Sequence, residues 1–365
     1  MDRRDFLNAA GAAAAIVAIK DVALPTSATA QAAASGPHMT WSIFSRHLQW
    51  VSTAAQAASD PYGTGVLIGQ SALAADFSAV DLTVRSQGHV EPTLVATNLP
   101  LMLNGIRSTG CICDQITTGI NPTTNPSDTA WISSQLVNQI VSTAAANGIK
   151  RYRIGAVAYS NNTFGTAMQS QLDGLRLNMR RLAQINAANG GITAIYHTFN
   201  NDIGTVIWDL LYVFSGMDPN LLGINYAQGH IVTDGPQSLW SINLRYGMPY
   251  IKGLALQDVI WTQDPVTKRW SSPTVVAGTG MTNYLQFFQL LLAGGYNGPA
   301  DLQIEFTIVG ANGISVSLNN TFFADNSQFT SGNLTPAIMI ANLKNDVDYY
   351  KTQATAAGWT AAQLT

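Results

Sequence analysis

Residues 193–226 read TAIYHTFNNDIGTVIWDLLYVFSGMDPNLLGINY, and this stretch decides the fold. It predicts a strand over Thr193–Thr198, a helix over Thr205–Phe214 and a second strand over Leu222–Tyr226. Both strands are short and mostly apolar, and a helix joins them. Such strands are expected to run parallel in a sheet whose two faces are both buried.

The same strand–helix unit repeats in both directions along the chain. Several predicted helices end at a glycine that precedes the next strand, as at Gly148 and Gly190, and this is where a helix C-terminus favours glycine. Further helices are expected over Thr129–Asn147, Thr166–Ala188, Thr282–Ala293 and Thr335–Ala357. The other expected strands are Thr40–Ser45, Ala79–Val84, Cys111–Ile116, Tyr152–Ala158, Ile251–Leu256 and Asp301–Phe306.

A parallel barrel closes when it has eight strands, each followed by a helix. The predicted fold class is therefore α/β, a (β/α)8 TIM barrel over residues 35–365, with inserts at 262–280 and 307–334. An open doubly wound sheet is the alternative. Such a sheet usually carries a G-x-G-x-x-G phosphate-binding turn after its first strand, and this sequence has none there.

The first 34 residues are typical of an export signal. Arg3-Arg4-Asp5-Phe6-Leu7 is a twin-arginine pattern, and a short alanine-rich apolar run and small-residue cleavage sites follow it. That run is too short to cross a bilayer, and no later segment has the length and apolarity of a span. We therefore expect a periplasmic or secreted protein. With a formal net charge of −3, the chain also lacks the basic surface that nucleic acids require.

Charged and imidazole side chains are scarce, and many of them follow predicted strands. The active site of a (β/α)8 barrel lies at the carboxyl ends of its strands. The residues expected there are His47, Arg85, His89, His197, His230, Asp258 and Glu305. A mixed set of imidazoles and carboxylates on one rim suits a divalent metal or a polar substrate such as a carbohydrate.

Isomerising or epimerising a sugar requires the removal of a proton from a carbon next to a carbonyl. His230, Glu305 and His89 are the candidate catalytic groups, because a carboxylate or imidazole can move such a proton. Arg85 is a candidate for binding a carboxylate or a hydroxyl-rich substrate. His47 and Trp261 complete the expected substrate contacts, and Glu305, Asp258, His197 and His230 are the candidate metal ligands.

Several segments, in order, resemble the sugar phosphate isomerase/epimerase (xylose isomerase-like) family. Ala79-Val-Asp-Leu-Thr-Val-Arg85-Ser-Gln-Gly88-His89 is similar to its second strand, and Asp258-Val-Ile-Trp261 is similar to its Lys-Asp-x-x-Trp motif after strand seven. The other matching segments are Gly148–Arg153, Trp208–Leu210, Asp218–Pro219, Gly223–Tyr226 and Gly298–Phe306.

The resemblance implies a xylose isomerase-like barrel with a divalent metal, Mn, Co, Mg or Zn, held by Asp, Glu and His at strand ends. This sequence departs from that pattern. It keeps His230 of an Asp-x-x-His motif but has Ala227 in place of the Asp ligand, and Phe199 and Gln303 stand where relatives carry histidines. The loss of a carboxylate is expected to weaken a divalent site.

The sequence leaves three functions open. The first is an exported sugar isomerase, epimerase or related lyase acting on a small-molecule carbohydrate. The second is a catalytically degraded barrel that binds a carbohydrate or a protein partner, as the substitutions at Ala227 and Phe199 suggest. The third is an endonuclease-like relative, which the acidic charge balance disfavours. The substrate, its phosphorylation and the oligomeric state are not specified by the sequence.

Overall fold

The protein is described here by a computed structural model that covers residues 36–160, 163–234, 239–318 and 327–365. Eight parallel strands close into a barrel in the order β1-β12-β7-β6-β5-β4-β3-β2. This confirms the predicted (β/α)8 fold. The barrel strands are β1 (His38–Phe44), β2 (Ala79–Val84), β3 (Ile112–Thr118), β4 (Arg151–Ile154), β5 (Thr193–His197), β6 (Leu222–Ala227), β7 (Ile251–Leu256) and β12 (Asn297–Leu302).

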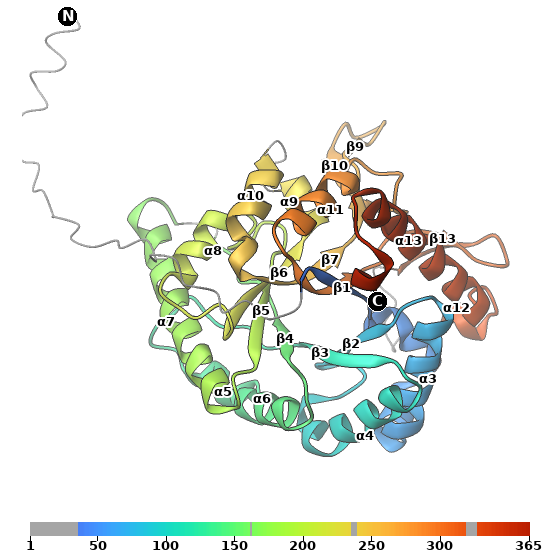
Figure 1. Ribbon diagram of the computed structural model, residues 1–365, viewed down its shortest axis with the longest axis horizontal. Coiled ribbons are helices and arrows are strands. Elements are labelled where there is room, and N and C mark those ends of the chain that lie inside the picture. The colour runs from blue at the N-terminus through green and yellow to red at the C-terminus, as the bar shows by residue number, and fades with distance from the viewer. Residues whose placement is uncertain (1–35, 161–162, 235–238, 319–326) are drawn as a thin grey trace, which may run out of the picture. The chain divides into compact units, whose positions relative to one another are not determined.

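Helices surround the barrel, as Figure 1 shows. The longest are α7 (Thr166–Ala188) and α13 (Pro336–Ala356). The remaining α-helices are α2 (Ala54–Ser59), α3 (Pro61–Ala74), α4 (Val95–Ser108), α5 (Ala130–Ser134), α6 (Val137–Ala146), α8 (Ile207–Phe214), α9 (Gln228–Asp234), α10 (Trp240–Gly247), α11 (Tyr284–Ala293) and α12 (Ser327–Thr330). Short 3-10 turns are η1 (Ser45–Val51), η2 (Pro92–Leu94), η4 (Met248–Tyr250) and η6 (Ala361–Gln363).

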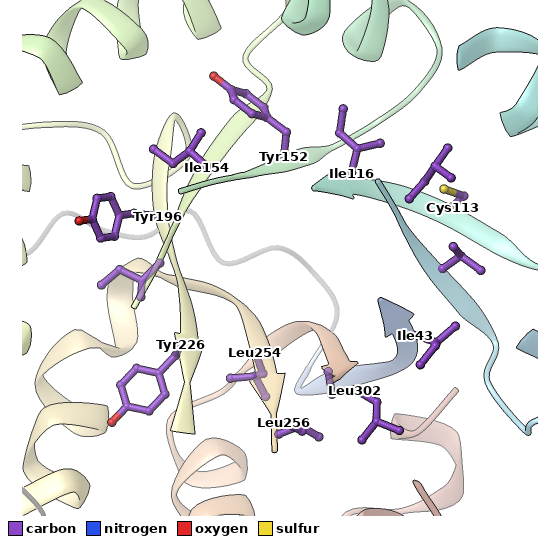
Figure 2. Packing of buried hydrophobic residues seen from close by; sticks show 14 of the residues in the cluster. Ile43, Cys113, Ile116, Tyr152, Ile154, Tyr196, Tyr226, Leu254, Leu256 and Leu302 are labelled. Atoms are coloured by element: carbon purple, nitrogen blue, oxygen red, sulfur yellow. The ribbon is translucent and has the colours of Figure 1, made fainter. Parts of the chain in front are cut away.

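The apolar core lies between the barrel and the helices. Alternate residues of each strand point outward, so Tyr152, Tyr196 and Tyr226 extend from three neighbouring strands (Figure 2) and are fully buried. Their hydroxyls are satisfied: Tyr152 donates to Asn186 of α7, and Tyr226 donates to the carbonyl of Trp240 in α10. These contacts tie the strands to the surrounding helices.

The barrel interior is unusually polar. The side chains of Asp81, Gln115, Asn225 and Asp301 are each no more than 1% exposed. Burial raises the pKa of Asp301 well above its ordinary value, and the neighbouring Asp81 carboxylate raises it further. Asp81 accepts a hydrogen bond of 2.6 Å from Thr117. Asp301 is therefore harder to ionise than an exposed aspartate.

Three predicted elements differ from the structure. The last strand is Asn297–Leu302 and not Asp301–Phe306, and the strand predicted over Tyr152–Ala158 is the shorter β4. The helix predicted over Thr129–Asn147 is interrupted at Leu136, which has a φ of 52° and separates α5 from α6. A left-handed residue cannot continue a right-handed helix.

Two hairpins leave the barrel after β7 and β12. β9 (Thr262–Gln263) pairs with β10 (Trp270–Ser271), and β13 (Thr307–Val309) pairs with β14 (Ser315–Ser317). β8 (Asp258–Val259) and β11 (Thr274–Val275) flank the β9–β10 hairpin in the sequence and pair with each other. The predicted export signal lies outside the described residues. Within the part of the chain that is described, no helix has the length and apolarity to cross a membrane.

Candidate functional site

A pocket of about 320 Å³ opens at the carboxyl ends of the barrel strands. Arg46 follows β1, Arg85 follows β2, Arg153 lies in β4, and Glu305 follows β12. Strand ends from around the barrel therefore meet at one place, as the topology requires. The pocket is lined by Phe44, Arg46, Arg85, Thr117, Thr118, Arg153, Ile154, Gly155, Ala156, His197, Phe199, Asp202, Gln303 and Glu305.

A second cavity of about 390 Å³ adjoins the first. The two cavities share Arg46, Phe199 and Glu305, which therefore form the partition between them. His230 and Gln257 line the second cavity, together with residues of the inserts that follow β7 and β12. The inserts thus contribute directly to the walls of the site.

Glu305 forms an ion pair with Arg46 across the partition. Its Oε1 lies 3.4 Å from Nη1 of Arg46, and the two side chains are 14% and 11% exposed. Two residues that are 259 positions apart in the sequence meet here because β1 and β12 are neighbours in the closed barrel. The pair places one carboxylate and one guanidinium where a bound ligand would contact both.

His197, which lines the first pocket, and His230, which lines the second cavity, lie close together. Their ring centroids are 5.9 Å apart. His197 Nδ1 lies 3.3 Å from the amide nitrogen of Asn225, and His230 Nε2 lies 3.1 Å from that of Gln257. The Phe199 ring packs on His230 at an interplanar angle of 58°, with a centroid separation of 4.4 Å.

Both imidazoles are neutral at physiological pH. Burial, and then the charge of Arg153, lowers the pKa of His230 to about 4, and the same two causes lower the pKa of His197 well below 6.5. A neutral imidazole can accept or donate a hydrogen bond, but it carries no positive charge to a ligand.

Asp258 is engaged by the backbone of its own insert. Its Oδ2 accepts from the N–H groups of Gly278 at 3.0 Å and Gly280 at 2.9 Å, and its Oδ1 accepts from Val259 at 2.9 Å and more distantly from Thr282. The side chain is 2% exposed and lines neither cavity. Its geometry indicates a structural role in holding this loop.

The other predicted site residues separate into two groups. Arg85 lines the pocket, whereas His47 and His89 are buried beneath it. His47 Nε2 accepts from the backbone N–H of Ile304 at 3.1 Å, and His89 Nδ1 lies 3.0 Å from the hydroxyl of Thr83. Trp261 is 36% exposed and lies outside both cavity linings.

Arg46 and Arg153 are the residues that sequence reasoning missed. Arg153 lies in β4 at an inward-facing position, and Arg46 is two residues beyond the end of β1. The signal was present in the sequence: with Arg85 they form a set of arginines at or just after strands one, two and four.

The donor set does not fit a divalent metal. Asp258 is bound by backbone N–H groups, Glu305 is paired with Arg46, and Ala227 offers no ligand atom. Across residues 36–365, apart from the three short undescribed segments, no three His, Cys, Asp or Glu side chains are grouped so as to hold a metal ion. A metal site needs several such ligands converging on one point.

The comparisons with known proteins agree with this fold. The xylose isomerase-like TIM barrel family profile matches residues 70–310. The structure of an L-ribulose 3-epimerase superposes with a TM-score of 0.59 at 14% identity, covering 87% of this chain and 95% of that one. A D-allulose 3-epimerase from Methylomonas sp. in complex with D-allulose has a TM-score of 0.59 at 12% identity, covering 87% of this chain and 98% of that one.

A xylose isomerase-like TIM barrel protein from Mycobacterium smegmatis in complex with magnesium has a TM-score of 0.58 at 14% identity, with 88% of this chain and 98% of that one covered. No curated protein sequence matches. At these identities the structural likeness shows the fold alone. The family profile covers well over half of the residues, and the chain therefore belongs to the xylose isomerase-like TIM barrel family.

Proposed function

We propose that the protein acts on a sugar or keto-sugar by moving a proton at a carbon next to a carbonyl, without a bound metal. The observation that supports this most is the Glu305–Arg46 pair in a pocket at the carboxyl end of the barrel. It supplies a base and a cation side by side. Structurally similar barrels include epimerases of ribulose and allulose.

The reaction requires a base that removes the proton and a group that stabilises the resulting oxyanion. In the first step the C–H bond breaks and its proton passes to the Glu305 carboxylate, while the electron pair forms a carbon–carbon double bond and the carbonyl oxygen becomes an oxyanion. The positive charge of Arg46 beside the carboxylate stabilises that oxyanion. Return of the proton from Glu305 to the neighbouring carbon on the same face, while the hydroxyl proton of that carbon passes to the oxyanion, regenerates a carbonyl and completes isomerisation.

The neutral imidazoles fit a supporting role. His197 faces the pocket without a positive charge, so it can donate a hydrogen bond to a substrate hydroxyl or oxyanion and remain neutral. His230 faces the adjoining cavity, where Gln257 fixes its ring. These contacts orient a polyhydroxylated ligand, and Glu305 moves the proton.

Hydrogen–deuterium exchange tests the proposal directly. The purified protein is incubated with a panel of neutral and acidic ketoses and aldoses in D2O, and loss of the proton signal next to the carbonyl is followed by NMR. Exchange is expected for at least one sugar, and Glu305→Gln should reduce it by about a hundredfold or more because the base is lost. Glu91→Gln is a matched control, since Glu91 is the chain's other glutamate, lines neither cavity and accepts a hydrogen bond from the backbone N–H of Gln87.

A binding protein without turnover is the second candidate. It is favoured by Phe199, which packs on His230, and by the donor set that does not fit a metal. Saturable sugar binding with no exchange for any sugar of the panel would refute the catalytic proposal and support this one.

We also propose that residues 1–34 direct export, from the Arg3-Arg4 pattern. Changing both arginines to lysine should leave the protein in the cytoplasmic fraction. Unchanged periplasmic or secreted localisation of that double variant would contradict the proposal.

A further inference from the structure

Three arginines line the pocket, and among the described residues only Arg46 has a carboxylate within ion-pair distance. Arg46 is paired with Glu305. No ion pair within the described residues involves Arg85 or Arg153. We call Arg85 and Arg153 the arginine pair. They extend from β2 and β4, so they approach the same cavity from two sides of β3.

One aromatic ring contacts both members of the arginine pair. The guanidinium carbon of Arg153 lies 4.4 Å from the Phe44 ring centroid, and that of Arg85 lies 5.6 Å from it. Both distances are within the range of a cation–π contact. Phe44 therefore holds two like charges close together at the pocket wall.

The positive charges of the arginines lower the pKa values of neighbouring groups. The pKa of Arg85 is lowered to about 10, first by burial and then by the charges of Arg153 and Arg46; Asp81 and Glu305 offset part of this. The pKa of His47 is lowered well below 6.5, again by burial first and then by the three arginines. Like charges held together at a partly dry site cost free energy unless an anion joins them.

One guanidinium nitrogen of Arg153 is buried without a hydrogen-bond partner in the described part of the chain. The residue is only 7% exposed, and its Nη1 has no hydrogen-bond partner among the described residues. Gln303 also lines the pocket, and its Nε2 is likewise buried without a partner in the described part of the chain. Buried donors are normally satisfied, so these two are polar groups in residues of the pocket wall for which the described part of the protein supplies no acceptor.

We propose that the arginine pair is a subsite for an anionic group on the ligand, a carboxylate or a phosphate monoester. The planar guanidinium fork matches both oxyanions. This assigns the ligand to the sugar acids or sugar phosphates. The sugar part rests on the proposed function, whereas the anion subsite rests on the arginine pair alone.

Calorimetric titration at low ionic strength tests the subsite without any need for turnover. The probes are gluconate for the carboxylate, glucose 6-phosphate and inorganic phosphate for the phosphate, and glucose as the neutral control. At least one anion is expected to bind about tenfold more tightly than glucose. Arg85→Gln and Arg153→Gln should each weaken anion binding by on the order of tenfold to a hundredfold, because each removes charge-assisted hydrogen bonds.

Controls separate a specific site from general charge. Arg269→Gln removes an exposed arginine from the β9–β10 connection and should leave anion affinity unchanged. Arg85→Lys keeps the charge but loses the fork, so its affinity should fall between those of wild type and Arg85→Gln. If Arg153→Gln does not fold, the Arg85 variants decide, because Arg85 is only partly buried.

Two results would overturn the subsite. One is equal binding of glucose and every anion, and the other is an Arg85→Gln variant with wild-type anion affinity. Failure of the proposed function looks different. Anion binding without deuterium exchange removes the proton transfer and keeps the subsite, whereas exchange on neutral sugars without anion binding removes the subsite alone.

Discussion

Replacing Asp258 tests whether its carboxylate stabilises the loop that surrounds it or binds a metal ion. The Asp258→Asn side chain has nearly the same shape, but one of its two oxygens becomes an NH2 group. The amides of Gly278 and Gly280 both donate to the same oxygen of the native carboxylate, at 3.0 and 2.9 Å. An asparagine side chain has only one oxygen, so some of the backbone N–H groups that donate to Asp258 must face its NH2 group instead.

The magnitude follows from those bonds. A hydrogen bond to a charged group contributes about 1.5–3 kcal/mol, so loss of two predicts a decrease of about 3 kcal/mol or more in the free energy of unfolding. The loop has little freedom to compensate. A Cβ at Gly280 would lie 2.2 Å from Oδ1 of Asp258, and Gly278 has a φ of 86°, so the backbone is closely fitted to the carboxylate.

Urea unfolding followed by tryptophan fluorescence measures the difference. Asp264→Asn is the matched control, because Asp264 also accepts from two backbone amides, of Val266 and Thr267, but in an exposed turn. Its effect should be much smaller. The reasoning is refuted if Asp258→Asn unfolds at the wild-type urea concentration, or if the wild type binds Mn²⁺ or Zn²⁺ and this variant alone loses that binding.

Three further predictions follow from other residues. His230→Gln should remove a pH-dependent loss of stability, because the pKa of His230 in the folded protein, about 4, lies below its unfolded value of about 6.5. Between pH 7 and pH 5 the free energy of unfolding of the wild type should therefore fall by about 2 kcal/mol more than that of the variant. Urea unfolding at each pH measures the difference. Lys268→Gly should raise stability by about 0.5–1 kcal/mol, because Lys268 has a φ of 59° in an exposed turn, and thermal unfolding would show it. Ala227→Asp should not create tight Mn²⁺ binding, because Asp258 and Glu305 stay engaged; a submicromolar affinity by calorimetry would contradict this.

The barrel could be predicted from the sequence because its strands and helices follow simple periodicities. The predicted helix Thr166–Ala188 agrees with α7 residue for residue, and Ala79–Val84 agrees with β2. The last strand was displaced because it begins with Asn297-Gly-Pro299, residues that usually mark a turn. Gly298 lies there because a Cβ would be 2.8 Å from the carbonyl of Lys252 on the neighbouring strand, a close approach that only the folded barrel reveals.

The site could be predicted only in part. Strand ends predict which residues gather at one rim, and His197, His230 and Glu305 do gather there. Their partners could not be predicted, since Arg46 reaches Glu305 only once β1 and β12 pair. The role of Asp258 depends likewise on a loop some twenty residues away, whose backbone amides turn toward it.

The polar interior of the barrel has a consequence for how the chain folds. An aspartic acid in an unfolded chain gives up its proton well below neutral pH, but the pKa of Asp301 is raised once the strands enclose it next to Asp81, so it holds its proton to a higher pH. Between the unfolded pKa of about 3.9 and the raised pKa in the folded protein, folding should therefore take up a hydrogen ion from the buffer, and the stability of the barrel should decrease as the pH rises through that range. In that range the hydrogen ion acts as a ligand that stabilises the folded barrel.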